Sequence, residues 1–516
     1  MTVNVCLRLA WAGLAVVLCV SACQPAAPTA PGPNAAPSLA ATAAQDGTLD
    51  LSSYGWDDRT PFRAGLVASQ QAVLSALPGA PVYHIAITVT ASLDALTGHE
   101  VVRYTNQTGA PLDQIVFHLF PNLLAGSLAV ENVEVNSTST STTLDQRGTI
   151  LRVPLRTALP ANGHADVALD FAVSVPHDLQ RNYGVFVYNQ NILALSHFFP
   201  LVAAYDQRGW NVEIPAPIGD LTYAEAAFYL VQLRAPAGPV VAGSGRLISR
   251  QAAKGEQVLT FAAGPARDFY LSLSPDYIVV SNQAGEVTVN SYAPAGHEPE
   301  ARSALEAAQA ALADYGARYG PYPYTELDVV ATSTTALGIE YPGIIAITLR
   351  VYDPNANFGG TPVTIMREST VAHEVGHQWF YNLVGDDQLD EPWLDESLTQ
   401  YITWQYYARQ YGSGGDQGFR NSLEGRWKTA DKPDMPIGLP VSAYTSSEYG
   451  AIIYGRGPLF FEALAQKLGP ANMDIFLADY VRQYQWKIAT GAGLKALAEQ
   501  HCGCDLSPLW QQWVNP

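Results

Sequence analysis

Residues 373–377 read His-Glu-Val-Gly-His, and residues 391–397 read Glu-Pro-Trp-Leu-Asp-Glu-Ser. Apolar residues on all sides of the first stretch predict a buried helix over 364–384, and the second stretch begins a helix predicted over 393–411. His373 and His377 are four residues apart, so on a helix both imidazoles stand on one face and reach a single cation. If the two helices pack together, Glu396 completes the ligand set.

Two imidazoles and a carboxylate are the protein ligands of a catalytic zinc ion, which keeps its fourth position for water. The spacing therefore predicts one Zn²⁺ per chain, held by His373, His377 and Glu396. Glu374 is rotated about 100° from His373 around the helix, so it can lie beside the open position and act as general base. The alternatives are a surface helix with two solvated histidines, and a site that has lost its metal. The apolar helix disfavours the first, because unpaired buried polar groups are costly.

The chain before this helix has a different pattern. Short β-rich runs separated by Gly, Pro and Asn extend from residue 82 to about 280, and Ile85, Ile87 and Val89 share one face of the first run. Many short strands at this spacing predict an antiparallel β-sandwich of roughly 200 residues. The runs are 83–89, 100–105, 114–119, 165–171, 227–233, 258–261 and 277–280. A helix is predicted before them, over 61–77.

Beyond a boundary near residues 282–297 the apolar period becomes helical. The fold class that follows is multidomain: an N-terminal all-β antiparallel sandwich at 51–284, then an α+β catalytic domain at 285–516 that is mostly helical in its C-terminal half. Strands are predicted at 327–331 and 344–349. The remaining helices are predicted at 299–319, 457–467, 473–484 and 489–500.

The first residues have the pattern of a processing signal. Residues 1–22 contain a twelve-residue apolar run, too short to span a bilayer but typical of a signal peptide. Val-Ser-Ala-Cys at 20–23 resembles the bacterial lipobox, which implies cleavage before Cys23 and its lipidation. Residues 23–50 are rich in Ala and Pro and read as a linker. We therefore expect an extracytoplasmic lipoprotein, anchored to the bacterial membrane through lipid only; an ordinary secretory signal is the alternative.

Composition excludes several classes. The chain has 28 basic and 47 acidic residues, a net charge of −19, so no basic footprint for nucleic acid is expected. Five cysteines in 516 residues exclude a disulfide scaffold. Cys502 and Cys504 form a Cys-Gly-Cys pair for which a disulfide, two free thiols and half of a metal site all remain open.

The motif and its surroundings resemble the gluzincins. The eighteen residues between His377 and Glu396 are similar to the gap in the aminopeptidase N family, peptidase family M1. Leu-Gly-Ile-Glu-Tyr-Pro at 337–342 looks like the exopeptidase motif of that family, and residues 449–457 look like its Y-x-K-G segment. The likeness extends from about residue 60 to the end. It implies a thermolysin-like catalytic domain, without the C-terminal helical-repeat domain of larger members.

The resemblance also implies roles for single residues. Glu340 would bind the α-ammonium group of a substrate, with Gly338 in the same motif; Tyr454 would donate a hydrogen bond to the tetrahedral oxyanion, and Tyr449 is a further substrate-binding candidate. An exposed acid on an edge strand is the alternative for Glu340, and a packed core tyrosine for Tyr454. A carboxylate between apolar residues suits an ammonium group, because such charge-assisted hydrogen bonds are strong.

The chain departs from the family pattern at several positions. Ser397 stands where the family has Gly, and Thr403 where relatives often carry a carboxylate that orients a zinc histidine; Gln400 or Thr403 is expected to serve instead. The family's Gln or Glu from the β domain is not evident near 194–198. His197 is a substitute there, or a structural histidine.

The sequence predicts a zinc-dependent aminopeptidase that removes N-terminal residues from peptides with a free N-terminus. Two alternatives remain: a gluzincin endopeptidase, and a non-catalytic peptide-binding lipoprotein of the same fold. Neither the preferred N-terminal residue nor the oligomeric state follows from the sequence.

Overall fold

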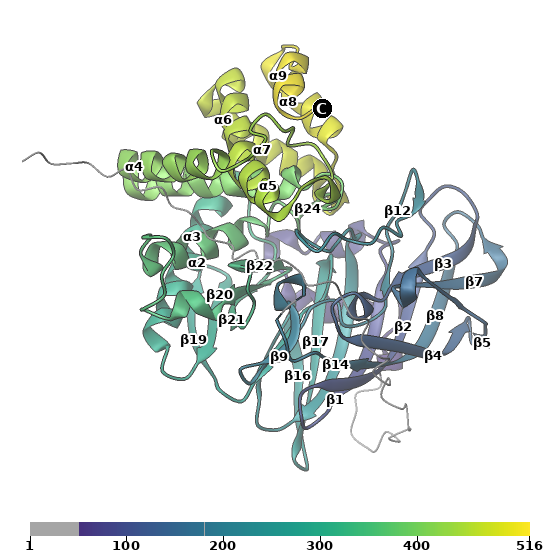
Figure 1. Ribbon diagram of the computed structural model, residues 1–516. Coiled ribbons are helices and arrows are strands. Elements are labelled where there is room, and N and C mark those ends of the chain that lie inside the picture. Colours follow the sequence, from purple (N-terminus) through teal and green to yellow (C-terminus); the bar gives the residue numbers. More distant parts are fainter. Residues whose placement is uncertain (1–50, 180, 516) are drawn as a thin grey trace, which may run out of the picture.

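The computed structural model describes residues 51–179 and 181–515. The predicted signal peptide, Cys23 and most of the linker lie outside the described residues. A β domain lies beside a second domain, whose helices form the green and yellow part of the molecule (Figure 1). In the described part of the chain no helix is both long and apolar enough to cross a membrane.

The β domain is built around an eight-stranded sheet. Two four-stranded sheets complete it, and a single apolar core contains side chains from all three sheets. As predicted, Ile85, Ile87 and Val89 of the first strand are buried on one face. The eight strands, in spatial order, are β16 (Arg246–Ala253), β17 (Glu256–Ala266), β14 (Ala227–Pro236), β1 (Val82–Val89), β2 (Ala95–Thr105), β8 (His164–Ser174), β4 (Ser127–Val135) and β5 (Thr138–Ser139).

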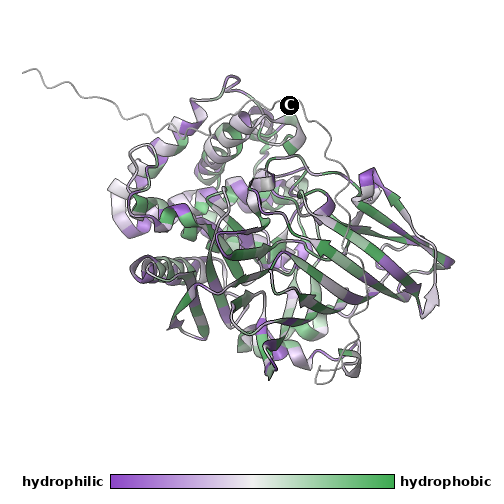
Figure 2. Ribbon diagram, turned by 60° about the horizontal axis from the view of Figure 1, so that its bottom comes forward, coloured by the Kyte–Doolittle hydropathy of each residue, from purple (hydrophilic) through white to green (hydrophobic). Residues whose placement is uncertain are grey.

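The two smaller sheets face this large one. The first has the order β11 (Leu201–Val202), β3 (Leu112–His118), β7 (Ile150–Leu159) and β6 (Thr143–Asp145). The second has the order β15 (Val240–Gly243), β18 (Leu271–Ser274), β10 (Ile192–Leu195) and β9 (Phe186–Asn189). The predicted sandwich is confirmed, although it is not purely antiparallel, because β1 and β14 pair in parallel. Hydrophobic and hydrophilic positions alternate along the strands in Figure 2.

The second domain begins earlier than the sequence indicated. Strand β19 (Tyr277–Ala284), which we assigned to the sandwich, forms a hairpin with β20 (Val287–Pro294) and belongs to a five-stranded sheet with β21, β23 and β22. Strand periodicity identifies a strand but not the strand with which it pairs. The predicted domain boundary at 284/285 is therefore wrong, because β19 pairs within the second domain. The other strands of this sheet are β21 (Glu326–Thr332), β23 (Ile344–Thr348) and β22 (Gly338–Tyr341).

Two helices of the second domain pack on this sheet and on each other. Helix α2 (Glu298–Tyr319) is confirmed, with the Pro and acidic residues of its first turn at the favoured end. Helix α3 (Val363–Gly376) ends at Gly376, with His377 as its C-cap, so the predicted extension to residue 384 is wrong. The chain turns at Tyr381, which has a φ of 139°, and continues into β24 (Val384–Gly385).

The remaining helices form the upper layer in Figure 1. The helix predicted over 393–411 starts as a π-helical turn, η8 (Trp393–Ser397), and continues as α4 (Leu398–Trp427) past a left-handed Gly412. The three helices predicted after residue 457 are confirmed with small shifts of their ends. The upper layer contains α5 (Ser446–Ala451), the π-helical turn η10 (Ile452–Arg456), α6 (Gly457–Leu468), α7 (Pro470–Tyr484), β25 (Lys487–Ile488), α8 (Gly491–Cys502) and α9 (Ser507–Trp513). Cys502 and Cys504 form a disulfide.

The helix predicted over 61–77 is not continuous. The chain has short 3-10 turns at Thr60–Gly65 and Ala68–Gln70 and a single α-helical turn, α1 (Val73–Ala76). Between the turns, Leu66 forms a β-bridge with Tyr324, and the Val67 amide donates to the carbonyl of Pro323. Pairing with the second domain replaces the helical hydrogen bonds of this segment.

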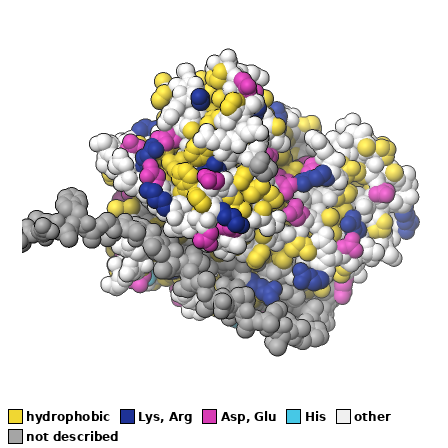
Figure 3. Space-filling model, turned by 45° about the horizontal axis from the view of Figure 1, so that its top comes forward, with side chains coloured by type: hydrophobic (Ala, Val, Ile, Leu, Met, Phe, Trp, Pro, Cys, Tyr) yellow, Lys and Arg dark blue, Asp and Glu magenta, His cyan; other side chains and the backbone are white. Residues whose placement is uncertain are grey.

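Surface charges are interspersed. On the face shown in Figure 3, Lys and Arg side chains stand among acidic ones, with hydrophobic side chains between them. Arg208, in the hairpin of β12 (Tyr205–Asp206) and β13 (Gly209–Trp210), pairs with Asp387 and Asp390 of the second domain. An ion-pair network therefore joins the two domains at the surface.

A buried arginine joins them in the interior. Arg267 follows β17, is 2% exposed, and donates to the backbone carbonyls of five residues. Three of these carbonyls, at Tyr381, Asn382 and Leu383, belong to the turn that ends the motif helix. The other two belong to Ala224 and Lys487. The guanidinium replaces the helical partners of that turn, which explains why α3 stops eight residues early.

We predict that Arg267→Met lowers the free energy of unfolding by about 3 kcal/mol or more, because it leaves several buried carbonyls unsatisfied. Equilibrium urea denaturation measures this change. Arg63→Met, at an exposed arginine of the same domain, is the matched control and should change stability by less than about 0.5 kcal/mol. Equal effects of the two substitutions would contradict the role of Arg267.

Candidate active site

The predicted metal ligands converge. His373 lies in the last turn of α3, His377 caps that helix, and Glu396 lies in the π-helical turn η8. Glu396 Oε2 is 3.0 Å from His373 Nε2 and 3.4 Å from His377 Nε2. The two Nε2 atoms are 3.1 Å apart. All three side chains are buried or nearly so, and one ligand atom from each lies within 4.8 Å of the others.

This donor set fits a divalent metal. Two imidazole nitrogens face the same point as a carboxylate oxygen, and a cation at that point would be bound by all three groups in a buried site where unbonded polar groups are costly. Nitrogen donors combined with one carboxylate suit zinc better than calcium or magnesium, which take oxygen ligands. The geometry therefore supports the ligand assignment made from the motif.

Glu374 lies beside the ligands and not among them. Its carboxylate, together with Glu340 and His377, forms a second group with ligand atoms within 4.8 Å. Gly338 of β22 makes room for it, because a Cβ at that position would lie 2.3 Å from Glu374 Oε1. Gly338 thus contacts Glu374, the general-base candidate. The motif resemblance alone did not indicate this contact.

Burial shapes the proton affinities of these groups. Desolvation raises the pKa of Glu374 well above its usual range, with the neighbouring Glu340 and Glu396 adding to the effect. Burial likewise raises the pKa of Glu340, to which Glu396 also contributes. The pKa of Glu396 shifts in the opposite direction. Burial by itself would raise this pKa, but hydrogen bonds from both histidines lower it below the usual value. Glu396 is therefore held as a carboxylate ligand, and Glu374 is the better proton acceptor.

The partners of the histidines differ from the prediction. His377 Nδ1 lies 3.0 Å from the Phe380 carbonyl and 3.4 Å from Thr399 Oγ1. Thr403, which we expected to orient a histidine, donates to the Thr399 carbonyl instead, one helical turn away. Among the described residues, no hydrogen bond joins Gln400 to either histidine. His373 Nδ1 is buried without a hydrogen-bond partner among the described residues.

Ser397, at the position where the family has Gly, is accommodated by another glycine. Its hydroxyl donates to the carbonyl of Ile453 over 2.6 Å. A Cβ on Gly457 would lie 1.9 Å from Ser397 Oγ. The substitution therefore fits without displacing Glu396.

Tyr454 reaches the ligand cluster from η10. Its hydroxyl donates to Glu396 Oε1, and its ring lies 6.0 Å from that of His373. Burial, reinforced by the charge of Glu396, raises its pKa well above the usual range, so Tyr454 keeps its proton and remains a donor. Tyr449 lies behind it, with ring centroids 5.8 Å apart, and its buried hydroxyl has no hydrogen-bond partner among the described residues.

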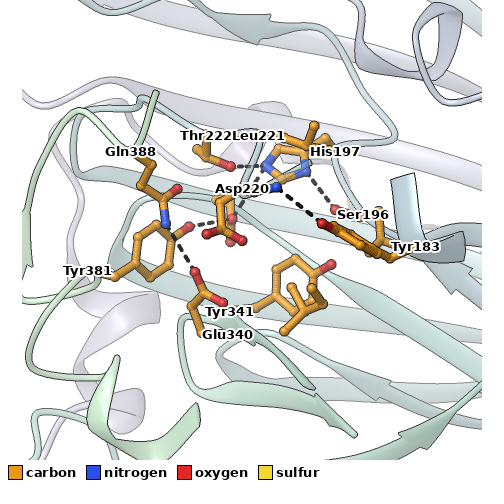
Figure 4. A pocket seen from close by; sticks show the side chains of 14 residues that line it. Tyr183, Ser196, His197, Asp220, Leu221, Thr222, Glu340, Tyr341, Tyr381 and Gln388 are labelled. Carbon is orange, nitrogen blue, oxygen red and sulfur yellow. Dashed lines mark hydrogen bonds and ion pairs between the residues drawn. The ribbon is translucent and has the colours of Figure 1, made fainter. Parts of the chain in front are cut away.

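Glu340 lines a recess between the two domains. Glu340 and Asp220 both line this recess (Figure 4). Glu340 Oε1 accepts from Gln388 Nε2 over 3.0 Å, and the same amide donates to Asp395 over 2.7 Å. Carboxylate oxygens of Asp220, Glu340 and Asp395 lie within 4.8 Å of one another. Glu340 is thus buried, and the alternative of an exposed acid is wrong.

Several residues of the recess were missed from the sequence. Asp220 and Asp268 come from loops of the β domain that carry no motif, and only the fold brings them to the site. Gln388 lies between the two parts of the metal motif, and this position is the one sequence signal that could have identified it.

His197, a candidate from the sequence, lines the recess, but its Nδ1 and Nε2 are held by Ser196 and Thr222 at 2.6 and 2.5 Å. Burial lowers the pKa of His197 to about 3, so the ring is neutral.

Comparison with known proteins gives a consistent result. Residues 303–513 match the peptidase family M1 domain. The chain is 26% identical over 276 residues to aminopeptidase M1-B of Oryza sativa subsp. japonica, covering 49% of this chain and 31% of that protein. It is 24% identical over 153 residues to a leucyl aminopeptidase of Saccharolobus solfataricus, covering 28% of this chain and 19% of that protein. The chain thus spans about a third or less of the curated relatives it matches.

Solved structures share the fold over most of the chain. An M1 zinc metallopeptidase from Deinococcus radiodurans superposes with a TM-score of 0.64 and 20% identity, covering 85% of this chain and 93% of that one. A mutant of the same protein has been solved with a Tyr-Ser-Ala substrate; its TM-score is 0.62, its identity 20%, and the match covers 84% of this chain and 94% of that one.

The predicted architecture, a β domain followed by an M1-type catalytic domain, is therefore confirmed. Residues 303–513, the region that matches the peptidase family M1 domain, contain the three ligand residues, Glu340, Glu374 and Tyr454.

Proposed function

We propose that this chain is a zinc-dependent aminopeptidase that hydrolyses N-terminal residues from peptides. One observation carries the proposal. The buried carboxylate of Glu340 lies beside the His373–His377–Glu396 cluster, and ligand atoms of Glu340, Glu374 and His377 lie within 4.8 Å of one another. A free α-ammonium group at Glu340 would place the adjacent carbonyl at the ligand cluster. The similarity to relatives named as aminopeptidases also supports the proposed activity.

The residues present would each have one task. His373, His377 and Glu396 would hold a single Zn²⁺, which supplies a Lewis acid that polarises the carbonyl and lowers the pKa of water. Glu374 would take the proton from the attacking water and transfer it to the leaving amine. The Tyr454 hydroxyl would donate a hydrogen bond to the oxyanion, where negative charge develops.

The end of the cleft favours an exopeptidase over an endopeptidase. Beyond Glu340 the recess is lined by residues 219–222 of the β domain and by Tyr341 and Tyr381. A peptide that continued past Glu340 would bury its backbone among carboxylates, which cannot donate the hydrogen bonds that its carbonyls need. A terminal ammonium group pairs with them instead.

Glu374→Gln should keep zinc and lower kcat by about 10²–10⁴-fold, because the proton acceptor is lost while the ligands stay. Metal analysis and steady-state kinetics on a chromogenic aminoacyl anilide measure both. Glu368→Gln, on the same helix, is the matched control; Glu368 accepts hydrogen bonds from Tyr406 and Tyr411 and lies away from the cluster. Turnover of Glu374→Gln near that of the control would refute the role of Glu374.

N-acetylation of a substrate should lower kcat/KM by about tenfold to hundredfold, because the charge-assisted hydrogen bond to Glu340 is worth about 1.5–3 kcal/mol. Glu340→Gln should reduce kcat/KM of free-amine substrates by a similar factor and narrow the gap between free and blocked peptides. Chelation should abolish both activities and zinc restore them. An enzyme that cleaves blocked and free peptides equally is an endopeptidase.

We further propose that the protein acts outside the cytoplasm as a lipoprotein, on peptides that arrive from outside the cell. The support is the sequence at 20–23 alone. Cys23→Ser should move the protein from the membrane fraction to the soluble fraction in a bacterial host and abolish labelling by a fatty-acid analogue. Membrane association that survives this substitution would contradict the anchor.

A further inference from the structure

The recess beyond Glu340 has a distinctive chemistry. Its polar lining includes three carboxyl groups, those of Asp220, Asp268 and Glu340, and in the described part of the chain neither lysine nor arginine lines it. The neutral His197 is already held by two hydroxyl groups. A ligand that enters this space meets acceptors and finds no fixed cation.

Asp268 is an incompletely bonded acceptor in this wall. Its side chain is 2% exposed, and its Oδ2 accepts from the Tyr381 hydroxyl over 2.7 Å. Its Oδ1 is buried without a hydrogen-bond partner among the described residues. The adjacent Arg267 is committed to backbone carbonyls and not to this carboxyl group. A buried acceptor without a donor is costly, and a donor carried by a ligand removes that cost.

The rest of the wall suits a long side chain with a polar end. Val185, Leu221 and Ile339 are aliphatic, and Tyr183 and Tyr341 present aromatic rings (Figure 4). Apolar walls pack against methylene groups, and the faces of aromatic rings attract a cation. An unbranched chain ending in a positive charge matches both parts of the recess.

The position of the recess relative to the reaction centre identifies which part of a substrate would enter it. Glu340 belongs to two groups whose ligand atoms lie within 4.8 Å of one another, one with Glu374 and His377 and one with Asp220 and Asp395. With the α-ammonium group at Glu340 and the scissile carbonyl at the ligand cluster, the α-carbon lies between them. The side chain on that carbon would then extend toward the recess, which Glu340 also lines.

We propose that this recess selects peptides whose N-terminal residue is arginine or lysine, with Asp268 and Asp220 binding the cationic end of the side chain. The proposal rests on the function proposed above, since it takes Glu340 as the site of the α-ammonium group. Burial raises the pKa of Asp268 to about 7, so near neutral pH a cationic partner favours the ionised form.

The first test compares matched substrates on the zinc-loaded full-length protein. Arginine and citrulline anilides have nearly the same shape and differ in charge, as do lysine and norleucine anilides. We expect kcat/KM to be about tenfold to hundredfold higher for each charged member, as for a buried charge-assisted hydrogen bond. Equal rates within a pair, or faster cleavage of leucine or phenylalanine than of arginine, would overturn the proposal.

The second test assigns the effect to residues. Asp268→Asn and Asp220→Asn should each reduce the arginine-to-citrulline ratio by about tenfold, because an amide is neutral and offers one acceptor. Asp113→Asn, at an exposed aspartate of the same domain, is the matched control and should keep the ratio of the unchanged protein. A ratio that neither recess substitution alters would overturn the assignment, as would a fall in all substrates by one common factor.

A binding measurement separates this inference from the proposed function. Calorimetry on the zinc-loaded Glu374→Gln protein should show L-arginine amide binding about tenfold more tightly than L-citrulline amide. If this preference appears but no peptide is hydrolysed by the unchanged protein, the proposed function fails and the recess assignment stands. If peptides are hydrolysed but the preference is absent in binding and in rate, the function stands and the selectivity for basic residues is rejected.

Discussion

The active site depends on one electrostatic constraint: acidic groups are buried side by side where water cannot screen them. Glu340, Glu374 and Glu396 surround His377, and Asp395 and Asp220 stand just beyond. Carboxylates this close repel one another strongly in a medium of low dielectric constant. Cations relieve the repulsion, and in the proposed function two of them would do so: a metal between the imidazoles, and an ammonium group at Glu340. The arrangement is therefore suited to binding a cation and a cationic peptide terminus together.

The β domain is part of this site and not only a neighbour. It contributes Asp220, Asp268 and His197 to the recess, and through Arg267 it holds the turn that follows the motif helix. That turn includes Phe380, whose carbonyl contacts His377 Nδ1. A guanidinium with five carbonyl partners specifies one path for the chain, because each planar N–H group points in a fixed direction. The position of a metal ligand is thus set partly by a side chain more than a hundred residues earlier in the chain.

The errors of sequence reasoning have related causes. Apolar periodicity continues past Gly376, so it extended the motif helix to residue 384, whereas Arg267 draws the carbonyls of that segment away from helical bonding. Strand β19 has the pattern of a sandwich strand, but hydrogen bonds to β20 decide its sheet. Thr403 shares a helix face with Glu396, yet its hydroxyl bonds to its own helix. In each case the local pattern was read correctly, and a contact distant in sequence decided the outcome.

The sequence by itself determined the chemistry of the metal site. On any α-helix, residues four apart such as His373 and His377 stand on one face. The carboxylates at 374 and 396 can accept a proton or bind a cation. The helical and strand segments that carry them also follow from local periodicity. Only the tertiary structure decided that Glu340 is buried, that Gly338 leaves room for Glu374, and that Asp220 and Asp268 line one recess. Such neighbours come from loops and strands far apart in the chain, and local periodicity contains no information about which of them meet.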